Sequence, residues 1–278
     1  MRIRRPTRGL RWYFEHNDGR MIHKWLHYFE VYERHVSRFR GRRVTLLEIG
    51  VSHGGSLEMW RHYLGRRATI VGIDISPRVA ELASPGIDVL VGDQSDESFL
   101  EELVQRYGSF DVIIDDGSHF PEHQKASIEY LWPHLNDGGI YVVEDLHSNY
   151  WSDYGGRVGS PETFIAWLGH RIDDMHAFHS RDDDFVVNDW TRTLNGLHVY
   201  DSIAVLDKHL REPLENRRTG RPVFDDIYGT QADSMIDEYH RRQLESLGRP
   251  MARVRRTLRD PRGAYRRATA RFKRDDDM

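Results

Sequence analysis

The sequence predicts an α/β protein built around a doubly wound parallel sheet. From residue 44 onward, short apolar runs alternate with segments of helical periodicity, which is the order that right-handed βαβ units require. Each run is apolar at nearly every position, as expected for a strand that helices cover on both faces. With 278 residues, the chain is also long enough to bury one large core.

Five of the apolar runs are the predicted strands of this sheet. They are rich in β-branched residues and lie at 44–49, 69–74, 87–91, 110–115 and 140–144. A later run at 196–208 predicts either a pair of strands or one long strand at the edge of the sheet.

Helices are predicted between the strands, at 56–64, 95–107 and 121–135, with a short turn at 77–83. For the second of them we expect Ser95 as the N-cap, acidic residues in the first turn and Gly108 as the stop. Upstream, 21–39 has the spacing of an amphipathic helix. Downstream, 146–195 is interpreted as a loop-and-helix insertion over the carboxyl edge of the sheet.

Composition excludes several classes of protein. The chain has no cysteine, so it holds no disulfide, no cysteine-ligated metal and no cysteine nucleophile. No apolar run approaches the roughly 20 residues of a membrane-spanning helix. The basic start of the chain lacks the apolar region of a secretory signal. We therefore expect a cytoplasmic protein without a membrane span.

Charge is distributed unevenly around the formal net value of −4. Residues 1–11 hold five arginines and no acid, and 241–274 hold thirteen lysines and arginines against two acids. Residues 12–240 carry a net charge of −17. These contrasts predict a basic arm with a helical segment at 1–40, the sheet domain at 41–212, and a basic extension at 213–278 that is partly helical or disordered.

The first predicted strand ends in a turn that suits a ligand, because ligands of open α/β sheets bind outside the carboxyl ends of the strands. It runs from Glu48 into Gly50, Gly54 and Gly55, and Ser56 then opens a helix. The glycine spacing differs from the dinucleotide fingerprint. An acid before the turn would repel a pyrophosphate and would suit an amino group. An ordinary glycine-rich turn is the alternative interpretation.

The next strands end in polar turns as well. Asp74 can accept both hydroxyls of a ribose, and Asp93 and Gln94 suit the edge of an adenine. Asp115, at the end of the fourth strand, completes the predicted cofactor-binding set. Together these turns describe an adenosine with an amino-acid-like tail, which is S-adenosylmethionine. Each acid taken alone has the alternative role of loop residue or helix cap.

The fourth and fifth strands supply the candidate reactive groups. Asp115, Asp116, Glu144 and Asp145 are expected to converge beside His119. Because unpaired buried carboxylates raise one another's pKa, we expect a divalent cation among them, and an all-oxygen set favours Mg²⁺ or Mn²⁺ over zinc. His119 suits a general base, since a histidine has an ordinary pKa of about 6.5. The alternative is that the acids cap helices and the histidine lies on the surface.

Five segments resemble the Mg-dependent, S-adenosylmethionine-dependent sugar O-methyltransferases of antibiotic biosynthesis, of the mycinamicin and demethylmacrocin type. Rhamnosyl O-methyltransferases and the cephalosporin hydroxylase-like group are relatives. The segments are LLEIGVSHGGS, GIDIS, GDQSD, FDVIIDDGSH and GGIYVVEDLH, and the resemblance covers roughly 20–210. The IDDGSH and EDL segments are the most specific, because a general class I methyltransferase lacks them.

The resemblance implies a Rossmann-like class I methyltransferase sheet at 41–212, with an N-terminal helix and an Arg-rich C-terminal extension. It implies Asp116, Glu144 and Asp145 as Mg²⁺ ligands, and His119 as the base. The implied acceptor is a hydroxyl of a sugar or glycosylated small molecule, or of a polyol. A homo-oligomer is possible, and no specific nucleic acid is expected. We expect the chain to lack the additional N-terminal domain of the macrolide enzymes.

Two alternatives stay open. The same fold could methylate a catechol or another vicinal diol, since Trp132, Tyr150, Trp151 and Trp167 could stack on either kind of ring; the alternative for most of these side chains is packing in the core or in a lid. The basic stretch at 253–267 could instead bind a nucleic acid or a membrane surface. A solvated tail, docked on the acidic body of the protein, is the simpler interpretation of that stretch.

Overall fold

The computed structural model describes residues 9–182, 184–212, 214 and 219–220. The chain divides into two compact units, one of Met1–Met175 with Thr193–Arg211 and one of His176–Arg192 with Glu212–Met278. The sheet and the candidate site lie in the first unit. None of the helices in the described part of the chain combines the length and the apolar character that crossing a membrane requires.

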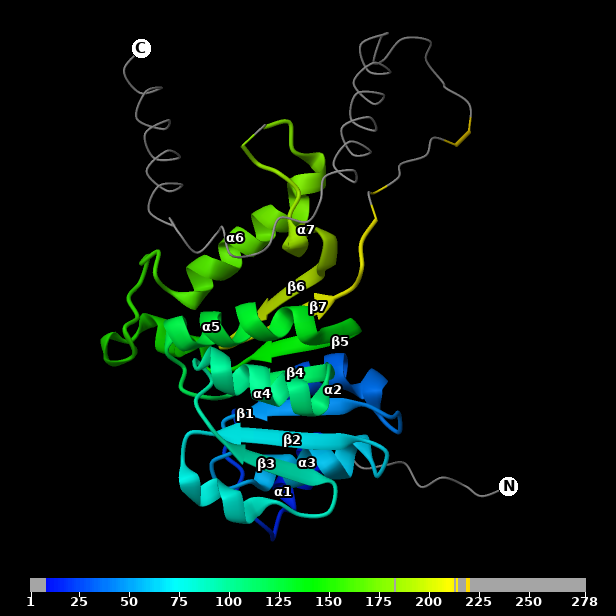
Figure 1. The fold of residues 1–278 in the computed structure, drawn as a ribbon, viewed down its shortest axis with the longest axis vertical. Coiled ribbons are helices and arrows are strands. Elements are labelled where there is room, and N and C mark those ends of the chain that lie inside the picture. The colour runs from blue at the N-terminus through cyan, green and yellow to red at the C-terminus, as the bar shows by residue number, and fades with distance from the viewer. Residues whose placement is uncertain (1–8, 183, 213, 215–218, 221–278) are drawn as a thin grey trace. The chain divides into compact units, whose positions relative to one another are not determined.

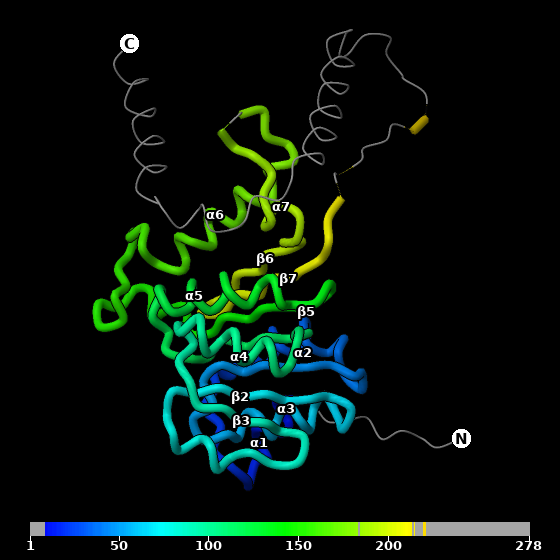
Figure 2. The backbone as a smooth tube through the Cα atoms, viewed as in Figure 1, coloured from blue at the N-terminus to red at the C-terminus, as the bar shows by residue number. Residues whose placement is uncertain are grey.

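A seven-stranded sheet forms the centre of the first unit, in the order β3-β2-β1-β4-β5-β7-β6 (Figure 1). Its strands are β1 Thr45–Ile49, β2 Thr69–Asp74, β3 Ile87–Val91, β4 Phe110–Asp115, β5 Leu135–Val143, β6 Leu194–Tyr200 and β7 Ile203–Lys208. The first five strands are parallel, and β7 pairs antiparallel with both β5 and β6. The path of the backbone through them can be followed in Figure 2.

Helices cover both faces of this sheet. On one face, α1 Leu10–Glu15, α2 Tyr28–Val36 and α3 Gly55–Leu64 share a buried apolar cluster with alternate strand residues such as Leu46 and Ile114. On the other face lie α4 Glu97–Tyr107 and α5 Pro121–Leu131 (Figure 1). The remaining helices are α6 Phe164–His176 and α7 Asp189–Thr193. The predicted doubly wound α/β architecture is confirmed.

The register of the sheet brings the carboxyl ends of three strands together. Ile49 pairs with Asp115 across β1 and β4, and Asp115 pairs with Val143 across β4 and β5. The loops that follow β1, β4 and β5 therefore start at the same level of one sheet edge. This edge is where ligands of open α/β sheets bind.

The predicted strands at 69–74, 87–91 and 110–115 have the predicted bounds, and the late run at 196–208 is the β6–β7 hairpin. The end of the third predicted helix was wrong, since α5 stops at Leu131 and a 3-10 turn follows at Trp132–His134. Pro133 explains the change, because it has no N–H with which to continue an α-helix. The N-cap of α4 is Asp96, not Ser95, because the Asp96 carboxylate accepts the N–H of Ser98.

The predicted helix at 21–39 was wrong over its first third. Residues 21–27 form no α-helix, and α2 begins only at Tyr28. Two tertiary contacts override the helical spacing. The Arg20 and Met21 carbonyl groups lie so close to Gly55 that a Cβ there would meet them at 2.3 and 2.5 Å. Lys24 is drawn into a group of buried carboxylates. The short helix α1 was not predicted.

The predicted division at residues 40 and 212 stays a prediction. Residues of α1 and α2 are packed into the core of the first unit, including Leu10, Tyr28 and Tyr32. The predicted extension at 213–278 lies outside the described residues, apart from 214, 219 and 220.

Candidate active site

The loop after β1 has a backbone that only particular residues allow. Gly50 has φ +90°, and a Cβ at this position would lie 2.0 Å from the Asp116 carbonyl oxygen. Ser52 also has a positive φ, of +50°. The Asp74 carboxylate fixes the loop by accepting the N–H groups of Val51 at 2.9 Å and of Ser52 at 3.0 Å. The loops after β1 and β4 are therefore packed directly on one another.

A cavity of about 280 Å³ opens at this sheet edge. Seven of the predicted site residues line it, namely Gly50, Ser56, Asp74, Asp116, His119, Glu144 and Asp145. Its other wall comes from the segment that precedes α2, including Lys24 and Trp25. The structure thus brings the ends of four strands together around one space.

Glu48 does not line the cavity. It is fully buried, and its carboxylate accepts hydrogen bonds from Ser56 Oγ at 2.8 Å and Trp60 Nε1 at 3.3 Å. Burial raises the pKa of Glu48 to about 7, against the opposing charge of Lys24 at 3.7 Å. Glu48 therefore joins the end of β1 to α3 in the interior, next to the glycine-rich turn. Its predicted contact with the cofactor stays a prediction.

Asp115 is also fully buried behind the cavity wall. It accepts hydrogen bonds from Ser127 Oγ at 2.7 Å, Gln94 Nε2 at 3.1 Å and Tyr141 Oη at 3.2 Å. Burial raises its pKa, and these hydrogen bonds oppose the rise. The side chain therefore ties β4 to α5 and to the loop after β3.

The remaining predicted cofactor residues shape neighbouring loops. The Gln94 amide oxygen accepts the N–H of Ser118, which links the loops after β3 and β4. Asp93 accepts both the N–H and the hydroxyl of Ser95. Gly54 has φ +77°, as the residue before α3. Gln94, Asp93 and Gly54 do not line the cavity, and their predicted roles in cofactor binding stay predictions.

A buried ammonium group lies among the carboxylates. Lys24 Nζ donates to Asp116 Oδ2 at 2.5 Å and to Glu144 Oε2 at 2.9 Å, and the side chain is only 3% exposed. Burial lowers the pKa of Lys24, but the charges of Asp116, Glu144 and Glu48 together raise it well above its usual range. Lys24 is therefore charged where it lies among these carboxylates, and sequence reasoning did not find it.

Two tyrosines of α2 hold the carboxylates that follow β5. Tyr32 donates to Glu144 Oε1 at 2.5 Å, and Tyr28 donates to Asp145 Oδ1 at 2.8 Å. Burial and the neighbouring carboxylates raise the pKa of both phenols, so they remain proton donors. The spacing of Lys24, Tyr28 and Tyr32, four residues apart, is the signal in the sequence that could have identified the three together.

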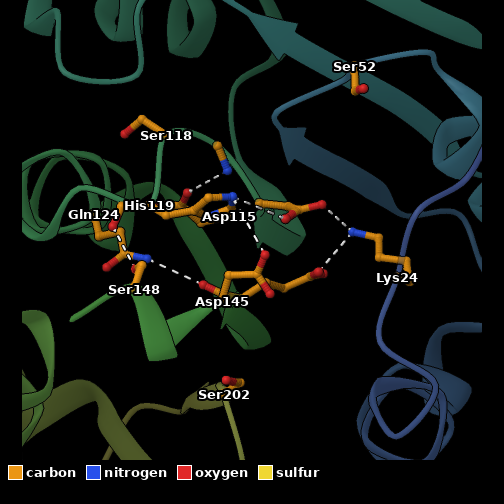
Figure 3. A network of polar contacts seen from close by, with 12 residues as sticks. Lys24, Ser52, Asp115, Ser118, His119, Gln124, Asp145, Ser148 and Ser202 are labelled. Carbon is orange, nitrogen blue, oxygen red and sulfur yellow. Dashed lines mark hydrogen bonds and ion pairs between the residues drawn. The ribbon is translucent and has the colours of Figure 1, made fainter. Parts of the chain in front are cut away.

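His119 lies on the other side of the carboxylates from Lys24 (Figure 3). Its Nε2 is 3.7 Å from Asp145 Oδ2 and 4.0 Å from Asp116 Oδ1. Its Nδ1 is buried and has no hydrogen-bond partner among the described residues. Both His119 and Asp145 have a positive φ, of +61° and +53°. Strained backbone of this kind is concentrated at functional sites.

The donor set fits a divalent cation. Asp116, His119 and Asp145 each offer an atom within 4.8 Å of the others. Both oxygens of Glu144 instead contact Lys24 and Tyr32. Burial and the charge of Asp116 raise the pKa of Glu144 to about 8, and a bound divalent cation would favour the ionised form of this carboxyl group. The predicted set of Asp116, Glu144 and Asp145 therefore lies together, with Glu144 turned toward Lys24.

A row of aromatic side chains begins at Trp25 in the cavity wall. Trp25 is 52% exposed and contacts the ring of His147 edge-on, with 5.8 Å between the ring centroids. His147 in turn contacts Trp151, which is 49% exposed. Tyr154 continues the row toward His119. Trp132 and Trp167 are buried, and Tyr150 is half-exposed.

Residues 47–146 match the family described as methyltransferase domain. The chain is 38% identical over 199 residues to demethylmacrocin O-methyltransferase of Streptomyces fradiae, covering 66% of this chain and 50% of that protein. It is 38% identical over 201 residues to mycinamicin VI 2''-O-methyltransferase of Micromonospora griseorubida, covering 66% and 48%. The chain thus spans about half the length of the curated relatives it matches.

A solved structure supports the same relationship. The MycE methyltransferase of the mycinamycin pathway, in complex with Mg, S-adenosylhomocysteine and mycinamycin VI, superposes with a TM-score of 0.62 and 32% identity. The match covers 76% of this chain and 54% of that one. The described sheet is therefore a class I methyltransferase fold, and two thirds of the chain resembles the sugar O-methyltransferases of antibiotic biosynthesis.

Proposed function

We propose that the protein is an S-adenosylmethionine-dependent, Mg²⁺-assisted O-methyltransferase that acts on a sugar hydroxyl of a glycosylated small molecule. The observation that carries the proposal is the position of His119, whose Nε2 lies within 4.0 Å of carboxylate oxygens of both Asp116 and Asp145 beside the glycine-rich turn. The similarity to sugar O-methyltransferases supports the substrate class.

The cofactor would bind against the loop after β1. Gly50 has the positive φ that this tight turn requires, and the N-terminus of α3 follows at the end of the same loop. Ser56 and Asp74 line the same wall and would contact the polar parts of the cofactor. The turn at Asp93 and Gln94 would support the adenosine indirectly, because Gln94 holds the loop after β4 through its hydrogen bond from the Ser118 N–H.

The carboxylates of Asp116, Asp145 and Glu144 would hold Mg²⁺. When bound, the ion would lower the pKa of the acceptor hydroxyl as a Lewis acid. Tyr28 fixes one oxygen of Asp145 and leaves the other directed toward His119. Tyr28 therefore orients the Asp145 carboxylate before any ligand arrives.

His119 would remove the proton of the acceptor hydroxyl at Nε2, which faces the carboxylate group. The acceptor oxygen would then attack the methyl carbon in line with the departing sulfur. Most of the acceleration would come from holding the two atoms about 3 Å apart, because methyl transfer needs no covalent intermediate on the protein.

One observation favours a second acceptor class. The exposed ring of Trp25 in the cavity wall could stack on an aromatic acceptor as well as on the apolar face of a sugar, and Trp151 continues the aromatic row from there through His147. A catechol is therefore the alternative acceptor. Binding of a nucleic acid or membrane through 253–267 stays a prediction outside the described residues. The cytoplasmic location and the homo-oligomer also stay predictions.

Calorimetric titration with S-adenosylmethionine tests the cofactor. Mass spectrometry of products from separate glycoside and catechol mixtures then tests the acceptor. We expect binding of one cofactor per chain and a mass increase of one methyl group on glycosides. Absence of heat with the cofactor would overturn the proposal, and methylation confined to catechols would replace the acceptor class.

A further inference from the structure

Lys24 occupies a position that the proposed metal chemistry does not explain. Its ammonium group binds Asp116 Oδ2 and Glu144 Oε2, and Glu48 Oε1 lies 3.7 Å away. Asp116 and Glu144 are two of the three proposed metal ligands. A cation built into the chain therefore already neutralises part of the site that a divalent ion would use.

A divalent ion on these oxygens would lie close to the ammonium group. Glu144 Oε2 accepts from Lys24 and Oε1 accepts from Tyr32, so a metal ion bound to Oε2 would share that oxygen with Lys24. The pair Lys24 and Glu144 is almost completely buried, at 3% and 1% exposed side chain. In such surroundings water screens the repulsion between two cations poorly.

The segment that carries Lys24 has no regular secondary structure. Residues 21–27 lie in no α-helix or strand, between the close packing of Arg20 and Met21 on Gly55 and the start of α2 at Tyr28. The next residue, Trp25, is half-exposed at the cavity border. Displacement of the lysine therefore requires rearrangement of one short, irregular segment and no change in the sheet.

We propose that Lys24 is a resident counter-ion that a divalent metal ion displaces from Asp116 and Glu144 when the site is loaded. The inference rests on the metal-assisted function proposed above. Without metal, Lys24 keeps the carboxylates together and compensates their charge. With metal, Glu144 turns from Lys24 to the ion, and the ammonium group moves into solvent together with its segment.

The rate at which the Lys24 amine is acetylated, in the chain without substitutions, tests the displacement directly. The chain has only four lysines, at positions 24, 125, 208 and 273, so each acetylated site is resolved by mass spectrometry. We expect acetylation of Lys24 by acetic anhydride to be about tenfold faster in saturating Mg²⁺ than in EDTA, within the usual range of coupled equilibria. Lys125, which donates to the Glu162 carbonyl at the surface, should not change. Protection of Lys24 under both conditions would overturn the proposal.

Metal affinity gives a second readout. Lys24→Met should bind Mn²⁺ about tenfold more tightly than the unmodified chain in calorimetry, because the competing cation is gone. Lys24→Arg keeps the charge and should gain no affinity, and Lys125→Met is the control for loss of one surface charge. Equal or weaker Mn²⁺ binding by Lys24→Met would overturn the inference alone. Absence of Mn²⁺ binding by every variant and by the unmodified chain would overturn it together with the metal-assisted function.

Discussion

Replacement of Gly50 by alanine should disturb the candidate site without removing any of its polar groups. The new Cβ would lie 2.0 Å from the Asp116 carbonyl oxygen. Carbon and oxygen atoms in contact are separated by about 3.3 Å, so the Asp116 backbone would have to retreat by about 1.3 Å. A displacement of about 1 Å in a reacting group costs roughly 10²-fold in rate. We therefore expect turnover to fall about a hundredfold, with Mn²⁺ binding weakened in parallel.

Gly65→Ala is the matched control for the backbone strain. Gly65 also has φ +90°, but a Cβ there would meet no atom within 4 Å. Both substitutions should lower the free energy of unfolding by about 1–3 kcal/mol, because each forces a Cβ onto a backbone of positive φ that residues other than glycine rarely adopt. For Gly50→Ala alone, the clash with Asp116 should lower the free energy of unfolding by about 1–3 kcal/mol more. Urea denaturation and turnover measure the two effects, and equal behaviour of the variants would refute the steric reasoning.

The other predictions concern single polar groups. His119→Ala should lower kcat by roughly 10²–10⁴ while calorimetry finds cofactor affinity unchanged, and an undiminished kcat would exclude His119 as the base. Tyr32→Phe leaves a buried oxygen of Glu144 without its donor, so urea denaturation should find about 1–3 kcal/mol less stability; an unchanged midpoint would contradict this. Burial and the charge of Asp116 raise the pKa of Glu144 to about 8, against the opposing charge of Lys24. In the folded protein Glu144 therefore keeps a proton that the unfolded chain releases near pH 4.5. The free energy of unfolding consequently decreases as the pH rises from about 4.5 to about 8. In EDTA, the unfolding free energy should fall over that range more steeply for the unmodified chain than for Glu144→Gln, and parallel profiles would show that Glu144 does not titrate there.

The sheet was predictable from local sequence because its strands are buried on both faces. A run such as 110–115 is apolar at nearly every position, and only a covered strand tolerates this. Charged residues directly after such runs, including Asp116 and Asp145, could be assigned to one edge because parallel strands end at the same side. The fold class and the convergence of the carboxylates follow from these two features.

The role of residues 21–27 was not predictable in the same way. Their apolar spacing continues that of α2, and local sequence gives no reason to end the helix before Tyr28. The contacts that decide their structure join Lys24 to Asp116 and Glu144, which follow it in the chain by 92 and 120 positions. Tertiary ion pairing thus overrides helical spacing where a lysine is required among carboxylates.

The direction of each acid was also hidden in the sequence. Asp115 and Asp116 are adjacent, and successive side chains of a strand point to opposite faces. Asp115 accordingly turns to Ser127 and Tyr141 in the interior, whereas Asp116 turns to the cavity and Lys24. The sequence identifies the end of this strand as a site. Only the structure shows that Asp115 supports the site from the interior and that Asp116 faces the cavity.

Conversion of S-adenosylmethionine to S-adenosylhomocysteine, with a mixture of glycosides as acceptor, tests the central claim most directly. The assay compares the unmodified chain and Asp116→Asn, first in EDTA and then after addition of excess Mg²⁺. We predict that turnover by the unmodified chain stops in EDTA and returns with Mg²⁺, and that Asp116→Asn shows no return. Full turnover in EDTA, or equal recovery in Asp116→Asn, would contradict metal-assisted methyl transfer at this site.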